Sequence, residues 1–318
     1  MKFKLNNGYE IPAIGYGTWQ AVDEELEKGL EKALEIGYRH IDTAAIYFNE
    51  HIIGKVLKNW ISSGKVKRED LYIVTKLPFH AVRGSSVEKM IKKSLKNLQL
   101  DYLDMYLVHG PFSFIDGDEF LPKDENGKII MDLDTDHVTL WKAMEDQVDA
   151  GRTRSIGLSN FNEKQIDKIL SVARIPPANL QIELHLYLQQ KSLVNWCKSA
   201  NILITSYSSL GTAATMKKFG KNVSSFLEND DIIKISEKYK KTPAQVALRF
   251  LVQNNIVVIP KSVNENRIKE NFQITDFELS DNDMKIIANL DKGEEGRLLL
   301  FEEHFPGIKN HPEYPFSV

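Results

Sequence analysis

Gly37-Tyr38-Arg39-His40-Ile41-Asp42 is a short apolar segment that ends in an acidic residue. Residues 71–76 and 102–109 repeat the pattern and end in Lys76 and His109. All three segments are rich in β-branched and aromatic residues and are separated by helical patterns, which predicts parallel strands joined by helices. Because the ends of neighbouring parallel strands share one rim, we expect Asp42, Lys76, His109 and the nearby Tyr47 to lie together.

Strand and helix patterns alternate along most of the chain. Eight strands are predicted, at residues 14–17, 38–42, 71–76, 102–109, 153–158, 180–184, 202–207 and 257–259. No Gly-x-Gly-x-x-Gly turn follows any of them, so the pattern favours a closed (β/α)8 TIM barrel of the α/β class over an open doubly wound sheet. No linker or low-complexity stretch divides residues 1–318, which predicts a single domain.

Three segments lie outside this repeat. Residues 2–5 and 9–11 flank Asn6-Asn7-Gly8, and an Asn-Gly turn of this kind is typical of a β-hairpin. Residues 111–136 and 210–229 are long polar segments between a strand and a helix. Loops of this length in a compact domain are usually functional or disordered, so we expect two long loops on the rim of the barrel.

The composition excludes several functional classes. The net charge is −3 and both signs are interspersed, which indicates no nucleic-acid or membrane partner. Cys197 is the single cysteine, and the N-terminal segment has no long apolar stretch, so we expect a cytoplasmic protein without an internal disulfide. No exposed apolar stripe is evident, which favours a monomer. No metal site is predicted.

The four rim residues suggest one chemistry. A carboxylate at Asp42 would keep Lys76 charged against desolvation. The lysine would then lower the pKa of the Tyr47 phenol, whose reference value is about 10, and ease proton transfer. A neutral His109 could orient a carbonyl oxygen. Each residue alone has a simpler explanation as a surface charge, a cap or a core-edge aromatic, but together they favour a site that polarises and protonates a carbonyl group.

A second polar cluster follows the eighth strand. Ile259-Pro260-Lys261-Ser262-Val263 is followed at helical spacing by Arg267, Glu270 and Asn271. In α/β barrels the loop after the last strands, leading into a short helix, is a recurring phosphate site. Lysine, a serine hydroxyl and the planar fork of arginine suit a phosphate monoester. From these residues alone, a capped surface helix with solvated charges is an equally good interpretation.

Five segments of this chain, in their order and spacing, resemble the signatures of the aldo-keto reductase family. They are Gly15-Tyr16-Gly17-Thr18-Trp19, Gly37-Tyr38-Arg39-His40-Ile41-Asp42-Thr43-Ala44, Gly157-Leu158-Ser159-Asn160-Phe161, Gln181-Ile182-Glu183 and Ile259-Pro260-Lys261-Ser262. The resemblance covers nearly the whole chain. It implies reduction of an aldehyde or ketone to an alcohol, with Tyr47 as the general acid, Lys76 and Asp42 as its tuning pair, and His109 as the orienting histidine.

The resemblance also implies that the cofactor is NADPH/NADP+ rather than NADH. The positions that match the nicotinamide site are Ser159, Asn160 and Gln181, with Tyr207 as the stacking ring. Those that match the loop over the pyrophosphate are Ser208, Leu210 and the segment after it. Those that match the 2′-phosphate and adenine pocket are Lys261, Ser262, Val263, Arg267, Glu270 and Asn271. Further cofactor contacts are implied at Gly17, Thr18, Trp19 and Asp42.

Two positions depart from the family's pattern on the substrate side. Gly110 stands where a tryptophan commonly follows the histidine, and Pro78 stands where a bulky aromatic residue is frequent. An indole buries on the order of 200 Å², so we expect a wider pocket that admits a bulky apolar carbonyl, such as a steroid-like ketone. The predicted substrate contacts are Trp19, Tyr47, Phe48, Phe79, His109, Gly110 and Phe112. The same region resembles insect members of the family that act on 3-dehydroecdysteroids.

Two alternatives stay open. The chain could be an aldose or small-aldehyde reductase, or a regulatory barrel that binds nucleotide with little turnover, as some barrels of the family do. The intact rim residues and the intact phosphate pocket favour catalysis. The tail from residue 293 is expected either to fold across the rim, as similar tails in the family do to set specificity, or to be a simple ordered cap.

Overall fold

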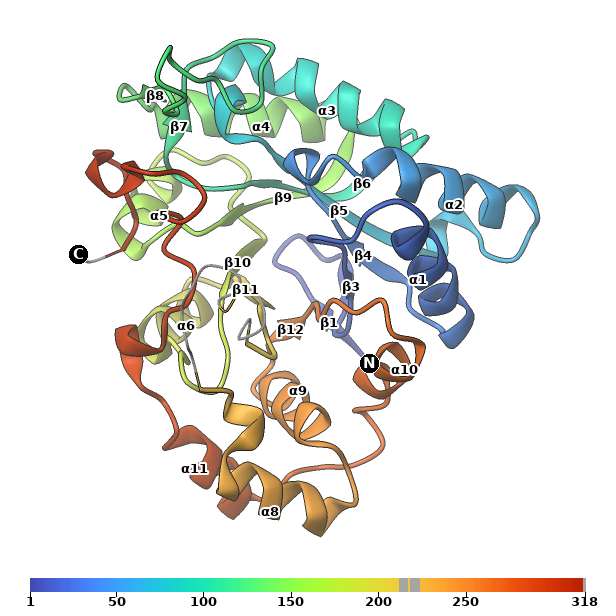
Figure 1. Ribbon diagram of the computed structural model, residues 1–318. Coiled ribbons are helices and arrows are strands. Elements are labelled where there is room, and N and C mark those ends of the chain that lie inside the picture. The colour runs from blue at the N-terminus through green and yellow to red at the C-terminus, as the bar shows by residue number, and fades with distance from the viewer. Residues whose placement is uncertain (212–216, 218–223, 317–318) are drawn as a thin grey trace.

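The computed structural model describes residues 1–211, 217 and 224–316. Its centre is an eight-stranded parallel sheet with the order β12-β11-β10-β9-β6-β5-β4-β3. The strands are β3 Tyr16–Gly17, β4 His40–Asp42, β5 Tyr72–Leu77, β6 Leu103–Val108, β9 Thr153–Ser159, β10 Asn179–Glu183, β11 Leu203–Tyr207 and β12 Val257–Val258. The backbone N–H of Gly15 donates to the oxygen of Val258 at 2.8 Å, so the first and last strands meet. The predicted (β/α)8 barrel is confirmed (Figure 1).

Amphipathic helices cover the outside of the barrel (Figure 1). They are α1 Asp23–Ile36, α2 Glu50–Ser62, α3 Gly84–Leu98, α4 His137–Asp149, α5 Glu163–Leu170, α6 Lys191–Ser199, α8 Asp230–Tyr239, α9 Pro243–Gln253, α10 Glu265–Phe272 and α11 Asp281–Ala288. The side chain of Thr242 caps α9, and Gln245 completes a capping box there. Within the described residues, no helix has the length and apolar character that crossing a membrane requires.

The N-terminal hairpin forms as the Asn-Gly turn predicts. Strands β1 Lys2–Lys4 and β2 Glu10–Pro12 pair antiparallel, and Gly8 adopts a φ of 90° in the turn between them. Leu5 and Ile11 are buried in one apolar cluster with barrel residues that include Tyr72, Val74 and Met105. The amide of Asn6 also donates to the oxygen of Pro177 at 2.8 Å. The hairpin therefore packs against the barrel strands.

Two segments that lack a strong sequence pattern cover the opposite side. The long segment after β6 contains a small hairpin of β7 Ser113–Phe114 and β8 Met131–Asp132, which the sequence did not predict. The C-terminal tail, red in Figure 1, runs past α5 to this hairpin. Its contacts include the His311 ring with the oxygen of Asp132 at 2.8 Å and Gln165 with the oxygen of Glu313 at 3.0 Å. The tail therefore joins distant parts of the rim.

Candidate active site

Asp42 and Lys76 form a buried ion pair at the ends of β4 and β5. The ammonium of Lys76 donates to Oδ1 of Asp42 at 2.6 Å and to the backbone oxygen of Thr43 at 2.8 Å. The side chains of Lys76 and Asp42 are 1% and 3% exposed. A buried charge without a partner is very costly, so each of these two side chains requires the other. Their predicted proximity is confirmed.

The pair is connected to the neighbouring polar groups. The second carboxylate oxygen of Asp42 accepts a hydrogen bond from the side chain of Gln181 at 2.7 Å. The Lys76 ammonium lies 5.2 Å from the centre of the Tyr47 ring. Tyr47 ends a short 3-10 helix, Ala45–Tyr47, directly after β4, and stays partly exposed. The phenol therefore lies between the buried charges and the open side of the barrel.

The pKa of Tyr47 is a point on which the sequence-based expectation was wrong. Burial raises the pKa of this phenol well above its ordinary value, and the negative charge of Asp42 raises it further. Lys76 does not reverse this, because its charge is matched by Asp42 at 2.6 Å. In this arrangement Tyr47 keeps its proton at neutral pH.

Burial also shifts the pKa values of the other two groups. It lowers the pKa of Lys76, and the nearby Asp42 opposes this decrease without cancelling it. The opposing effect of Asp42 is the one expected from the sequence. Burial, with the charge of Lys76 as a second cause, holds the pKa of His109 well below its ordinary value. A neutral imidazole, as predicted, follows from that shift.

His109 follows β6 and faces Tyr47. The two ring centres are 5.7 Å apart, with an interplanar angle of 75°. The side chain of Asn160 donates to the backbone oxygen of His109 at 2.9 Å, and the Tyr207 hydroxyl donates to the amide oxygen of Asn160 at 2.7 Å. Asn160 adopts a φ of 65° directly after β9, a conformation that asparagine tolerates better than most residues. The structure thus brings Asn160 and Tyr207 to the four rim residues.

The residues after β3 complete this side of the rim. The Thr18 hydroxyl donates to the backbone oxygen of Asp42 at 3.0 Å. A Cβ atom on Gly17 would lie 2.5 Å from the backbone oxygen of Ile259, so glycine permits the first and last strands to approach. Trp19 is half-buried, and its ring lies 5.8 Å from that of His304 in the tail. Ser159, also predicted, is buried and accepts from Asn160 at 3.0 Å.

The second polar cluster lies at the start of α10. The Ser262 hydroxyl accepts from the N–H of Asn264 at 3.1 Å, and the Asn264 side chain caps the N–H of Arg267 at 3.1 Å. The side chains of Lys261, Val263 and Arg267 are exposed beside this helix end. A lysine, an arginine and a hydroxyl at a helix N-terminus form a suitable donor set for a phosphate group. Glu270 is half-buried and Asn271 is buried one turn further along.

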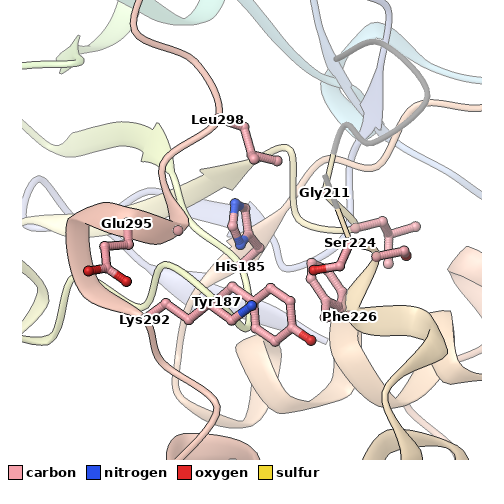
Figure 2. A pocket seen from close by; sticks show the side chains of 11 residues that line it. His185, Tyr187, Gly211, Ser224, Phe226, Lys292, Glu295 and Leu298 are labelled. Carbon is pink, nitrogen blue, oxygen red and sulfur yellow. The ribbon is translucent and has the colours of Figure 1, made fainter. Parts of the chain in front are cut away.

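The predicted pyrophosphate loop is described only in part. Ser208 adopts a φ of 51° and accepts the N–H of Gly211 at 2.7 Å. Leu210 is one of the residues that line a small cavity. Figure 2 shows this cavity with its other walls, which include His185, Phe226 and Leu298. Residues 212–216 and 218–223, which belong to the same prediction, lie outside the described residues.

The expectation of a wider pocket beside Gly110 was wrong. Phe79 fills the space next to this glycine, because a Cβ atom on Gly110 would lie 2.8 Å from its ring. Phe79 and Phe112 are 2% and 0% exposed, and their rings stack at 4.8 Å. The aromatic cluster that contains them is built from Phe79, Phe112, Phe114, Ile129, Phe305 and Ile308. Phe48, in contrast, is 59% exposed.

Glu183 is a functional candidate that sequence reasoning did not identify. This carboxylate at the end of β10 is fully buried. It accepts the N–H groups of Leu298 at 2.9 Å and Leu299 at 3.0 Å, and it lies 3.1 Å from the ring of His185. It therefore fixes the start of the tail to the barrel. A carboxylate within a predicted strand, two residues after Gln181, was the signal that could have revealed it.

The comparison with known proteins agrees with this geometry. Residues 13–292 match the model of the Aldo/keto reductase family, and the chain belongs to that family. It is an oxidoreductase that uses NADPH to reduce carbonyl groups.

Similar proteins span essentially the full length of the chain. Prostaglandin F synthase 1 from Bos taurus is 42% identical, with 99% of this chain and 97% of that protein covered. Aldo-keto reductase family 1 member A1 from Gallus gallus is also 42% identical, with coverage of 98% and 96%. The structure of the aldose reductase from Schistosoma japonicum matches with a TM-score of 0.91 and 42% identity, covering 100% of this chain and 99% of that one.

Proposed function

We propose that this enzyme reduces bulky apolar aldehydes or ketones, with Tyr47 as the general acid. The observation that carries the proposal is the buried Lys76–Asp42 pair, whose ammonium lies 5.2 Å from the Tyr47 ring. No structural requirement of a barrel explains a fully buried ion pair beneath a partly exposed phenol, because an apolar pair of similar volume would stabilise the fold as well or better.

Tyr47 would supply the proton. NADPH, when bound, supplies the hydride that adds to the carbonyl carbon. The raised pKa of Tyr47 keeps its hydroxyl protonated until the carbonyl oxygen gains negative charge. When the proton leaves, the phenolate would be stabilised by the nearby Lys76 ammonium, which acts in a site with little water. Asp42 and Thr43 hold that ammonium in place through bonds of 2.6 and 2.8 Å.

His109 would orient the carbonyl oxygen. Its pKa lies well below the ordinary value, so the ring is neutral and offers one N–H donor. A neutral donor at a distance from the charged pair adds no second positive charge to the pocket. Orientation of the carbonyl relative to Tyr47 contributes to the rate because reacting groups must be held close to their productive geometry.

The residues that would hold the cofactor fall into three groups. Ser159, Asn160 and Gln181 would bind the carboxamide of the nicotinamide, and Tyr207 would stack on its ring. Gly17, Thr18, Trp19, Ser208 and Leu210 would contact the central part. Lys261, Ser262, Val263, Arg267, Glu270 and Asn271 would hold the phosphorylated adenosine, and the donor set at the start of α10 supports a phosphate there.

The substrate preference rests on the apolar groups near Tyr47. Phe48 is 59% exposed and Trp19 is half-exposed, so both offer apolar surface to a ligand. A large apolar carbonyl, such as a steroid-like ketone of the ecdysteroid type, would bury more of this surface than a free sugar. One similar protein is named a prostaglandin F synthase and another an aldose reductase, so relatives' names leave both classes open. A cytoplasmic location and a monomeric state remain predictions from the composition.

A panel of carbonyl compounds tests the proposal. We expect a steroid ketone to give a higher kcat/KM than an aldose, with a small aromatic aldehyde between them, and NADPH to be preferred over NADH. Higher kcat/KM for the aldose would contradict the substrate class. Binding of NADPH without its oxidation by any compound would instead support a regulatory barrel.

A further inference from the structure

The imidazole of His109 makes no hydrogen bond to any described residue, although the backbone of His109 makes two. The backbone N–H of His109 donates to the oxygen of Leu77 at 3.3 Å, and its own oxygen accepts from Asn160 at 2.9 Å. In the ring, Nδ1 is buried and has no hydrogen-bond partner among the described residues. Histidines that act in catalysis are usually oriented by a hydrogen bond to the second ring nitrogen. Here another interaction must set the plane of the ring.

Aromatic packing supplies that interaction. The ring of Phe79 stacks on the imidazole, with centres 4.9 Å apart and an interplanar angle of 23°. The ring of Tyr47 meets it edge-on at 5.7 Å. Phe79 is itself held by two further rings. It stacks on Phe112, with ring centres 4.8 Å apart and an interplanar angle of 9°, and its centre lies 5.4 Å from that of Phe305 in the tail. Phe79 therefore has a fixed position and presents a flat surface to the imidazole.

Gly110 is what allows Phe79 to occupy this place. A Cβ atom at position 110 would lie 2.8 Å from Cε1 of Phe79, closer than van der Waals contact permits. The backbone of Gly110 does not have the positive φ that only glycine adopts readily. The requirement for glycine here is therefore one of space, and it comes from the phenylalanine ring.

We propose that Phe79 is a positioning residue for His109, and that Gly110 serves this function by admitting the ring. The stack fixes the plane of an imidazole that accepts or donates no hydrogen bond within the described parts of the chain. Ring pairs of this geometry are favourable beyond the area that they bury. The inference rests on the proposed role of His109 in orienting the carbonyl oxygen. It identifies Phe79 as the residue that orients the His109 ring.

Two variants test the inference. Phe79→Leu removes the ring that stacks on the imidazole, and Gly110→Ala displaces the Phe79 ring without removing it. The matched control is Phe114→Leu, because Phe114 is a buried ring of the same cluster whose nearest ring contacts, at 5.0 Å and 5.5 Å, are Phe305 and Phe79. The measurement is the single-turnover rate of NADPH oxidation with an aromatic aldehyde. The Kd of NADPH and the thermal stability are measured on the same samples.

We expect Phe79→Leu and Gly110→Ala each to slow the single-turnover rate by about 10-fold or more, as small misplacements of a catalytic group do, with an unchanged Kd for NADPH. The double variant should lose little beyond Phe79→Leu alone, because a shorter side chain leaves room for the added methyl group. Phe114→Leu should reduce thermal stability while the rate stays near that of the unmodified enzyme.

A normal rate in Phe79→Leu would overturn the inference, and so would an equal loss of rate in Phe114→Leu. His109→Gln separates this inference from the function on which it rests. If His109→Gln is slow while Phe79→Leu is normal, only the positioning role fails. If His109→Gln reacts at the normal rate, the proposed role of His109 itself fails.

Discussion

The polar rim and the aromatic cluster meet at His109, but they are held together by different interactions. On the rim, Asp42, Lys76 and Gln181 are joined by hydrogen bonds of 2.6 and 2.7 Å between residues at the ends of neighbouring or facing strands. In the cluster, Phe79, Phe112 and Phe305 are joined only by ring packing. Directional hydrogen bonds therefore position the rim residues, whereas close packing of the rings positions the residues of the cluster.

This difference suggests a division of tasks. Hydrogen bonds between strand ends depend on the barrel itself, so the residues of the proposed proton transfer are part of the rigid scaffold. The cluster is built from a loop, a small hairpin and the tail, which are the segments that vary most easily in length and sequence. A change in the rim should therefore alter the rate of the chemical step, whereas a change in the tail should alter the binding of substrate.

The largest expected effect comes from Lys76→Met, which removes the ion pair between Lys76 and Asp42 on the rim. Loss of the ammonium removes the group that would stabilise the Tyr47 phenolate, and loss of one electrostatic stabiliser typically reduces kcat by about 100- to 1000-fold. It also leaves Asp42 buried without its cation, so we expect a lower thermal stability. Steady-state kinetics with an aromatic aldehyde measure the first effect. Lys89→Met, which removes an exposed ion pair with Asp118, is the control and should leave kcat unchanged.

A smaller effect is expected from Glu183→Gln, which loosens the tail and leaves the rim residues in place. The amide presents only one acceptor to the N–H groups of Leu298 and Leu299, and an unsatisfied buried N–H costs roughly 1–3 kcal/mol. We expect KM for a bulky ketone to rise several-fold, with a smaller change in kcat for a small aldehyde. Glu294→Gln, which alters an exposed carboxylate of the same segment, should change neither. Equal losses for both substrates would show that Glu183 supports the rim as well.

The smallest expected effect on turnover comes from His40, which lies beneath the rim and should instead make the free energy of unfolding depend on pH. Burial lowers the pKa of His40 to about 4 from an ordinary 6.5. The unfolded chain therefore binds a proton more readily than the folded one below pH 6.5, and stability decreases as pH falls from 6.5 toward 4. A shift of this size corresponds to about 3 kcal/mol across that range. Urea unfolding at several pH values should give a shallower dependence for His40→Gln than for His51→Gln, a change at an exposed position.

The rim could be predicted from sequence because its residues follow directly from strand ends. Asp42 and Lys76 terminate apolar segments, and the parallel register then places them together. The N-terminal hairpin could be predicted as well, since its Asn-Gly turn depends on adjacent residues. The aromatic cluster could not, because Phe79, Phe112 and Phe305 come from segments that are far apart in the chain. Gly110 therefore suggested an empty space, which the structure fills with a ring.

The pKa of Tyr47 shows a second limit of sequence reasoning. The identity of the neighbouring charges could be read from the strand ends, but the balance between desolvation and those charges depends on burial. Burial dominates for Tyr47, Lys76 and His109 alike. The structure therefore corrects the expected lowered pKa of Tyr47 to a raised one, and the proposed general acid keeps its proton at neutral pH.

The central claim is that Tyr47 delivers the proton, and Tyr47→Phe tests it most directly. The change removes one hydroxyl and leaves the ring that packs against His109. We predict that the variant binds NADPH with an unchanged Kd, followed by fluorescence, while kcat for an aromatic aldehyde falls at least about 1000-fold. Substantial turnover in Tyr47→Phe with NADPH bound would contradict the claim.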